Sequence, residues 1–274
     1  MSISCSVTVA LAPEVRGGPF VFHTSPAELD AMLGQVAQLG FPGVEIFPGK
    51  PEDIEPEHLG PLLQKHGLKL AAVGSGAGWV IHKLRLSDPD VQVREKAVAF
   101  VGNLVKRAGA LGAPVIIGSM QGKADPDGKE ATLDRLGESV ARLGELSAQA
   151  GQRLLLEPLN RYESDLLNRL DDAAVLIRRL KTEHVAILAD LFHMNIEETD
   201  LAEAIVRAGP LVGHVHLADS NRSAAGLGHT PMDPVFAALR KIEYRGFVSA
   251  EVFPRPDALT AAARTLEVWR AKAR

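Results

Sequence analysis

The sequence of 274 residues has little cysteine and no long apolar run. Its one cysteine, Cys5, cannot form an internal disulfide, so nothing indicates an oxidising compartment. No apolar stretch reaches about 18 residues, which argues against a membrane span. The formal net charge of −4 gives no electrostatic reason to expect nucleic acid as a partner. The glycine-rich phosphate motifs G-x-G-x-x-G and the P-loop are also missing.

The composition, 46% hydrophobic and 23% charged, is that of a globular chain with a large core. The opening MSISCSVTVALAPEV has no basic segment, and its apolar residues alternate with Ser and Thr. It therefore predicts a first strand rather than a signal peptide. We expect a cytoplasmic protein that acts on a small molecule.

Short apolar runs alternate with segments of helical spacing along the chain. The clearest helical segment is 90–111, where apolar residues recur three and four positions apart. Ser25, Ser87 and Asp233 each stand just before a proline or an Asp-Pro pair, which predicts helix starts there. The predicted strands are residues 3–9, 43–47, 68–74, 114–118, 153–157, 185–190, 211–219 and 246–253.

Eight strand–helix units in this length predict an α/β protein with a single (β/α)8 TIM barrel, formed by residues 1–274 as one domain. A doubly wound open sheet is the competing architecture. It usually has fewer strands and a glycine-rich fingerprint after the first strand, which this chain lacks.

Polar residues stand at the carboxyl ends of the last four predicted strands, where TIM barrels carry their chemistry. They are Glu157, Asp190, His216 and Glu251, called here the strand-end residues. As bare charges the three carboxylates would repel one another, whereas a divalent cation would use all four side chains as ligands. The oxygen-rich set with one nitrogen favours Mn²⁺, Co²⁺ or Mg²⁺, and catalytic Zn²⁺ is also compatible.

Each strand-end residue also has a structural interpretation. Asp190 is placed to cap the following helix. His216 is consistent with an interior histidine, since His214 two residues earlier points to the same face. Glu251 is within reach of Arg255 for an ion pair. Separate structural roles would require four consecutive strands to end in such residues by accident, so a shared site is the preferred explanation.

A second set of polar residues follows these strand ends. Glu163, His193 and Arg222 offer the mixture of donors and acceptors that a polyhydroxylated substrate requires. A solvated loop ion pair is the alternative for such residues, and it is the preferred interpretation for Arg161.

The motifs EPLNRYESD, DLFHMNIEE, HVHLADSNR, GLGH and VSAEVF resemble those of the xylose-isomerase-like TIM-barrel superfamily. They are most similar to the D-tagatose/D-psicose 3-epimerase branch of ketose 3-epimerases. A related epimerase of 5-keto-L-gluconate has a similar set. The resemblance spans the chain and is densest from 153 to 253.

The resemblance implies that the four strand-end residues bind one divalent metal ion. It implies that Glu157 and Glu251 are also the two catalytic acid/bases, and that Glu163, His193 and Arg222 hold the first carbons and oxygens of a sugar. It also implies a homo-oligomer, a dimer or tetramer.

The chain departs from the family pattern at two positions. Leu191 stands where the epimerases commonly have Thr, and Gln121 stands where a loop arginine is frequent. Residues 75–83, with Trp79, do not match clearly enough to assign the far end of the substrate. Arg255 is a candidate to bind a carboxylate of the substrate, with a surface ion pair as the alternative.

The expected function is metal-dependent epimerisation of a ketose or keto-acid sugar at the carbon next to the carbonyl, through an enediolate. Aldose–ketose or hydroxypyruvate-type isomerisation uses the same intermediate and is the nearest alternative. An endonuclease IV-like phosphodiesterase is less favoured because it would need more histidines and a basic surface. A non-catalytic sugar-binding barrel would not need two opposed carboxylates.

Overall fold

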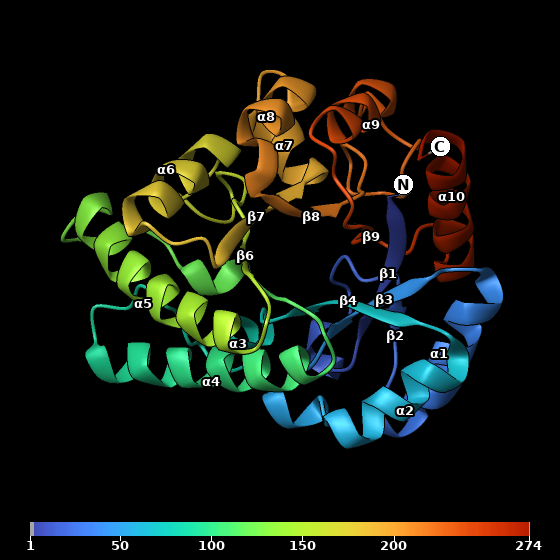
Figure 1. Ribbon diagram of the computed structural model, residues 1–274, viewed down its shortest axis with the longest axis horizontal. Coiled ribbons are helices and arrows are strands. Elements are labelled where there is room, and N and C mark those ends of the chain that lie inside the picture. The colour runs from blue at the N-terminus through green and yellow to red at the C-terminus, as the bar shows by residue number, and fades with distance from the viewer. Residues whose placement is uncertain (1–2, 274) are drawn as a thin grey trace.

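The protein is described by a computed structural model covering residues 3–273. Eight parallel strands close into a barrel, since β1 pairs with both β3 and β9 (Figure 1). The (β/α)8 expectation is therefore confirmed. The barrel strands are β1 (Ser4–Ala10), β3 (Gly43–Phe47), β4 (Lys69–Gly74), β5 (Val115–Ile117), β6 (Leu154–Leu156), β7 (Val185–Asp190), β8 (Val212–His216) and β9 (Phe247–Ala250).

One strand was not predicted. The two-residue β2 (Phe22–His23) pairs in parallel with the end of β1, so it extends the sheet outside the closed ring. The eight predicted strands otherwise correspond one to one with the barrel strands.

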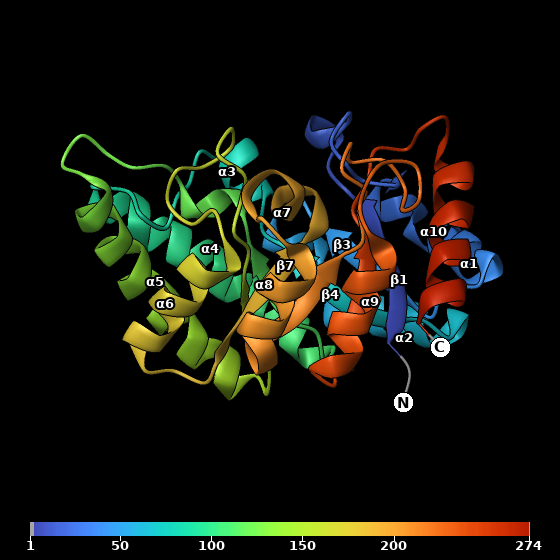
Figure 2. The same ribbon diagram turned by 90° about the horizontal axis from the view of Figure 1, so that it is seen from above.

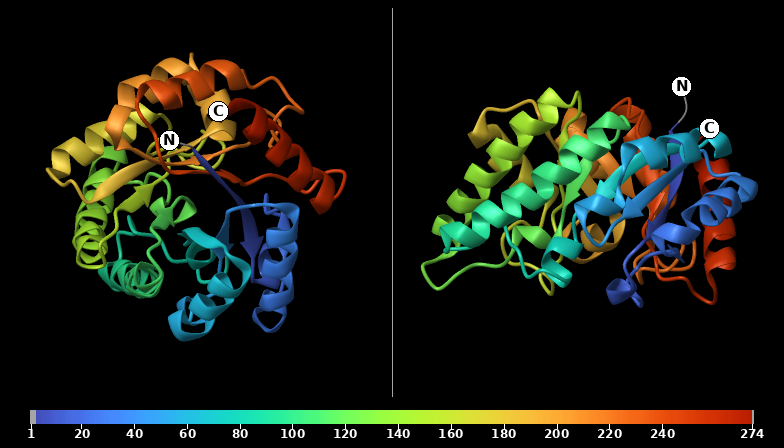
Figure 3. Two further views of the ribbon diagram at one scale, coloured as in Figure 1. Left: turned by 45° about the vertical axis from the view of Figure 1, so that its right-hand side comes forward. Right: turned by 90° about the horizontal axis from the view of Figure 1, so that it is seen from below.

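Helices surround the strands on the outside (Figure 3). Their apolar faces and the outward side chains of the strands form one continuous core. The helices are α1 (Leu29–Leu39), α2 (Pro56–His66), α3 (Ala77–Val80), α4 (Val91–Ala110), α5 (Lys129–Gln149), α6 (Leu170–Leu180), α7 (Leu191–Glu197), α8 (Leu201–Ala208), α9 (Met232–Lys241) and α10 (Ala258–Lys272). No helix in this part of the chain combines the length and apolar character needed to cross a membrane.

The predicted helix over 90–111 is confirmed as α4, but the predicted cap is wrong. Asp90 caps α4 by accepting a hydrogen bond from the backbone N–H of Gln92. Ser87 instead donates its hydroxyl to the carbonyl of Gln121, 34 residues along the chain. The hydroxyl of Ser87 therefore makes a tertiary hydrogen bond and does not cap α4.

The other two predicted helix starts are displaced as well. Ser25 precedes a 3₁₀ turn, η2 (Pro26–Glu28), and α1 begins only after it. Asp233 lies inside the first turn of α9. There its carboxylate still suits the positive end of the helix dipole.

The barrel interior is divided between an apolar and a polar side. Ala72, Ile116, Leu155, Ala186 and Leu188 pack together on the apolar side. Glu45, His214 and His216 form a hydrogen-bonded polar group elsewhere in the interior. In Figure 2 the amino end of β1 lies low and the short helices α3 and α7 lie high, so the carboxyl ends of the strands open toward the top.

Candidate active site

The four strand-end residues converge at the carboxyl end of the barrel. Asp190 and His216 are the last residues of β7 and β8, and Glu157 and Glu251 directly follow β6 and β9. All four are buried, and each offers one ligand atom within 4.8 Å of the others. Nδ1 of His216 lies 3.3 Å from Asp190 Oδ2 and 3.5 Å from both Glu157 Oε1 and Glu251 Oε2.

The burial of these charges perturbs their protonation. Burial raises the pKa of Glu157 to about 8, and the carboxylates of Glu251 and Asp190 add to this against the opposing effect of His216. Burial also raises the pKa of Glu251. Burial alone would lower the pKa of His216, but Glu251, Glu45 and the other carboxylates around it outweigh that and raise it well above its usual value. In the metal-free protein, bound protons therefore reduce the repulsion among these carboxylates, and a metal cation would do the same in their place.

The donor set fits a divalent metal ion. Three carboxylates and one imidazole, with no thiolate, match the ligands that Mn²⁺, Co²⁺ and Mg²⁺ accept, and Zn²⁺ is compatible. Asp190 serves as a helix cap at the same time: Oδ1 accepts from the N–H of Phe192 at 2.7 Å, which turns Oδ2 toward His216. Asp190 therefore caps helix α7 and belongs to the cluster of strand-end residues at the same time.

The predicted alternative partner of Glu251 is wrong. Glu251 pairs with Arg222, whose Nη2 donates to Oε2 at 2.7 Å. Arg255 is exposed, its guanidinium lies over the ring of Phe253, and it does not line the cavity. The position of Arg255 outside the cavity therefore does not support a role in binding a substrate carboxylate.

His193 presents a free donor to the site. Its Nδ1 receives the backbone N–H of Asn160 at 3.2 Å and lies 2.7 Å from Asn160 Nδ2. Both groups are donors, so Nδ1 accepts and Nε2 carries the hydrogen. Nε2 is buried without a hydrogen-bond partner, 3.7 Å from Asp190 Oδ2 and 3.9 Å from Glu157 Oε1. Burial lowers the pKa of His193, which keeps the ring neutral.

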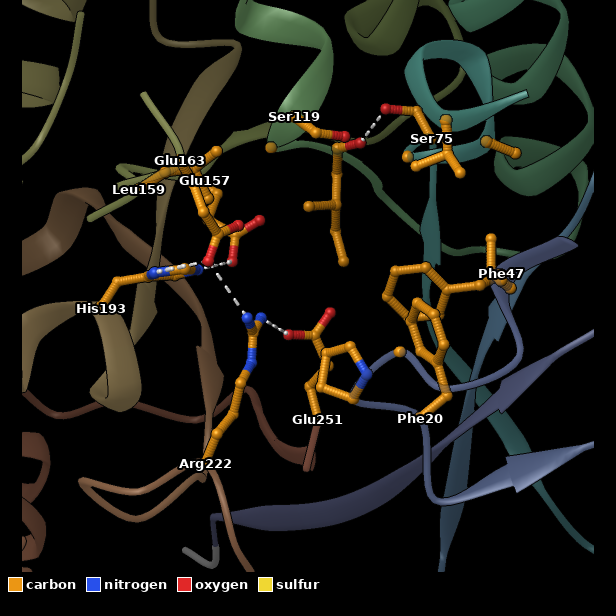
Figure 4. Close-up of a pocket in the computed structure, with 18 of the residues that line it drawn as sticks. Phe20, Phe47, Ser75, Ser119, Glu157, Leu159, Glu163, His193, Arg222 and Glu251 are labelled. Carbon is orange, nitrogen blue, oxygen red and sulfur yellow. Dashed lines mark hydrogen bonds and ion pairs between the residues drawn. The ribbon is translucent and has the colours of Figure 1, made fainter. Parts of the chain in front are cut away.

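Arg222 and Glu163 complete this wall of the cavity. Arg222 Nη1 lies 3.3 Å from Glu163 Oε1, and its guanidinium lies 4.7 Å from the ring centroid of Phe192. Glu163, His193 and Arg222 all line the cavity, as Figure 4 shows. By contrast, Arg161 pairs with Glu197, as predicted.

The cavity has a volume of about 280 Å³. The carboxylates, His193 and Arg222 form one wall, and Phe20 and Phe47 face them across the space (Figure 4). From segment 75–83, Ser75, Gly76, Ala77 and Val80 line the cavity, whereas Trp79 does not.

Sequence reasoning missed Glu45. It lies within β3, fully buried, and accepts from His214 Nε2 at 2.6 Å and from His216 Nε2 at 3.0 Å. Burial would raise its pKa, but the two imidazoles outweigh this and hold the pKa well below its usual range. The available signal was a single carboxylate inside the apolar run GVEIF.

Gly118 was also missed, and Gln121, one of the two departures from the family pattern, supports the backbone of Glu157. A Cβ on Gly118 would overlap the carboxylate of Glu157. Gln121 is buried and donates from Nε2 to the backbone carbonyl of Glu157 at 3.0 Å. Leu191, the other departure, packs its side chain into the core.

The model of the xylose isomerase-like TIM barrel family matches residues 33–272. The chain belongs to this family. Among family relatives, the chain is 31% identical over 252 residues to D-psicose 3-epimerase of Ruminiclostridium cellulolyticum. This match covers 89% of the chain and 84% of that protein. The chain is 31% identical over 243 residues to 3-dehydro-D-guloside 4-epimerase of Escherichia coli, covering 85% and 90%.

The family fold is matched over nearly the whole length. The crystal structure of D-psicose 3-epimerase with D-tagatose from Clostridium cellulolyticum H10 aligns with a TM-score of 0.83 at 25% identity and covers 99% of each chain.

Proposed function

We propose that the protein is a divalent-metal-dependent sugar epimerase that inverts the carbon next to a ketone. The names of both relatives support this chemistry. One names a 3-dehydro sugar and inversion at carbon 4, and the other names psicose, a 2-ketose, and inversion at carbon 3. In each case the inverted carbon is adjacent to the carbonyl.

The observation that carries the proposal is the placement of Glu157 and Glu251. They extend from β6 and β9, with β7 and β8 between them, and both line the same cavity. Both are buried, and burial raises the pKa of each. A raised pKa makes a carboxylate a better proton acceptor, which favours its use as a general base.

In the proposed reaction, one glutamate removes the proton from the carbon next to the ketone, which leaves a single negative charge on the former carbonyl oxygen of the enediolate. The other glutamate returns a proton to the opposite face, which inverts the carbon. Which of Glu157 and Glu251 acts as base depends on the epimer bound. Two positioned acid/base groups typically contribute roughly 10²–10⁴-fold each.

The strand-end residues would hold one Mn²⁺, Co²⁺ or Mg²⁺ ion, with Zn²⁺ also compatible. The ion would supply Lewis-acid polarisation of the carbonyl. The N–H of His193 at Nε2 is oriented to donate to a substrate oxygen, and Arg222 and Glu163 are placed to bind neighbouring hydroxyls. These contacts would orient the sugar between the two glutamates.

The test is proton NMR in D₂O, on reactions with added metal that are quenched with a chelator. The panel is tagatose, fructose, 5-ketogluconate and hydroxypyruvate. We expect deuterium next to the carbonyl together with a new diastereomer. Deuterium with an aldose or aldehyde product would identify an isomerase, and no exchange with Mn²⁺, Co²⁺ or Mg²⁺ would contradict the proposal for these substrates. The homo-oligomer stays a prediction, which sedimentation velocity checks.

A further inference from the structure

Glu45 is a carboxylate in the interior of the barrel that the proposed reaction does not use. It extends from β3 to two histidines of β8, with one imidazole on each carboxylate oxygen. His214 Nε2 lies 2.6 Å from Oε2, and His216 Nε2 lies 3.0 Å from Oε1. All three residues are buried. The contacts on both oxygens fix the rotation of the carboxylate.

Stability does not account for this group. Taking charges out of water is costly, and replacing a buried ion pair by apolar residues is often neutral or stabilising. The interiors of such barrels are ordinarily filled by branched apolar side chains, as on the apolar side of this one. A carboxylate in this position therefore calls for another explanation.

The explanation lies in the two ring nitrogens of His216. Nε2 faces Glu45, which has acceptor oxygens only, so Nε2 must carry a hydrogen. Nδ1 faces Asp190, Glu157 and Glu251 at 3.3 to 3.5 Å. With one hydrogen held on Nε2, the neutral form of the ring has its lone pair on Nδ1, directed into the strand-end cluster.

We propose that Glu45 is a positioning residue that fixes the tautomer and ring orientation of His216 so that Nδ1 serves as a metal ligand. His214 holds the second oxygen of Glu45 and keeps the carboxylate in place. The proposal rests on the metal site of the proposed function. Carboxylates that hold a ligating histidine in this way typically contribute 10–100-fold to metal affinity.

A second metal ion bound by Glu45, His214 and His216 is the competing interpretation, because these residues also converge. The 2.6 Å separation of Glu45 Oε2 and His214 Nε2 is a hydrogen-bond distance. Two ligand atoms of one ion, each about 2.1 Å from it, lie roughly 3 Å or more apart. The geometry therefore favours hydrogen bonds over a second ion.

The first experiment measures Mn²⁺ binding by isothermal titration calorimetry in the full-length wild type and in Glu45→Gln. Glu198→Gln is the matched control, because it makes the same change in a carboxyl whose side chain is only 3% exposed and which accepts from the N–H of Leu170, away from the cluster. We expect one Mn²⁺ per chain, with affinity about 10- to 100-fold weaker in Glu45→Gln and within about twofold of wild type in Glu198→Gln.

A second measurement needs no variant of Glu45. Nitrogen-15 NMR of histidine-labelled wild type loaded with Mg²⁺ reports the tautomer of each ring, and His216→Gln assigns the signal. We expect a hydrogen on Nε2 of His216 and none on Nδ1. A hydrogen on Nδ1 would overturn the proposal even if Glu45→Gln failed to fold.

The remaining outcomes separate the two proposals. Unchanged Mn²⁺ affinity in Glu45→Gln, or a second equivalent in the wild type that this variant loses, would overturn the positioning role alone. Metal binding that responds as expected, without turnover of any sugar, would support the role of Glu45 and overturn the epimerase function. A wild type that binds no divalent metal would overturn both.

Discussion

Arg222 Nη2 lies 2.7 Å from Glu251 Oε2, and only 12% and 7% of the two side chains are exposed. The same guanidinium contacts Glu163 through Nη1 and lies over the ring of Phe192. Carboxylates outweigh the effect of burial and raise the pKa of Arg222, so it stays charged. One side chain therefore connects the loop after β8 to the acid/base candidate after β9.

We predict that Arg222→Lys lowers kcat/KM by roughly 10- to 100-fold, the equivalent of one lost charged hydrogen bond. A lysine ammonium is a point charge and cannot reproduce a planar fork that contacts two carboxylates and stacks on a ring. Steady-state kinetics measure the change. Arg161→Lys is the control, because its partner Glu197 lies outside the cavity. Equal kinetics for both variants would contradict a substrate-site role for Arg222.

Glu157→Gln and Glu251→Gln test the two-base mechanism. At saturating Mn²⁺, we expect each to lower kcat by roughly 10²–10⁴-fold without unfolding the protein. Because the remaining glutamate still reaches one face, each variant should exchange the hydrogen of one epimer with D₂O without inverting it. NMR of both epimers checks this. Near wild-type turnover in either variant would end the two-base proposal.

Gly118→Ala tests how closely the backbone of the β5 end must approach Glu157. A Cβ at position 118 would overlap the Glu157 carboxylate, so the carboxylate must move. A displacement of about 1 Å at a reacting group can cost roughly 10²-fold in rate, and we expect a loss of this order in kcat together with weaker Mn²⁺ binding.

The control for this substitution is Gly76→Ala. A Cβ there lies 3.5 Å from Ser119 Oγ, which is an ordinary contact, so Mn²⁺ affinity should stay within about twofold. If Gly118→Ala binds Mn²⁺ as tightly as Gly76→Ala does, the position of the Glu157 carboxylate does not depend on having glycine at position 118.

Much of the fold could be predicted because its signals are local. β3 and β7 begin and end at the predicted residues. Pro42 and Pro48 flank the apolar run of β3, and the polar His184 and Asp190 mark the two ends of β7. Helix caps were less accessible to sequence reasoning. Ser87 has the right chemistry for a cap, but its hydroxyl is used by a carbonyl brought near only by the fold.

The candidate site divides in the same way. The strand-end residues were predictable because parallel strands present their carboxyl ends at one edge of a barrel. Glu45 was not, because its partners are 169 and 171 residues away and meet it across the interior. The alternation of β3 indicates which face Glu45 occupies, but not which side chains lie opposite.

The strand-end carboxyls also set the pH dependence of the metal-free protein. Folded Glu157 keeps its proton up to a pKa of about 8, whereas the unfolded chain loses it near the ordinary value of 4.5. Between these values the folded state binds more protons, so stability falls as pH rises. The raised pKa values of Glu251 and His216 act with the same sign. The lowered pKa of Asp190 acts only at lower pH, where stability is lost as pH falls.

We therefore predict that the melting temperature of chelator-treated protein decreases from about pH 7 to pH 8, above the range in which the lowered pKa of His193 acts with the opposite sign, and that the stabilisation by added Mn²⁺ increases over the same range. The cation binds the deprotonated carboxylates, so metal binding releases protons and becomes tighter as pH rises. Differential scanning calorimetry with and without Mn²⁺ measures both trends. In Glu157→Gln the metal-free slope should be shallower, because position 157 no longer titrates. A metal-free melting temperature that rises toward pH 8 would show that the strand-end carboxyls are not protonated in the folded protein, and would remove the electrostatic reason for a cation at this site.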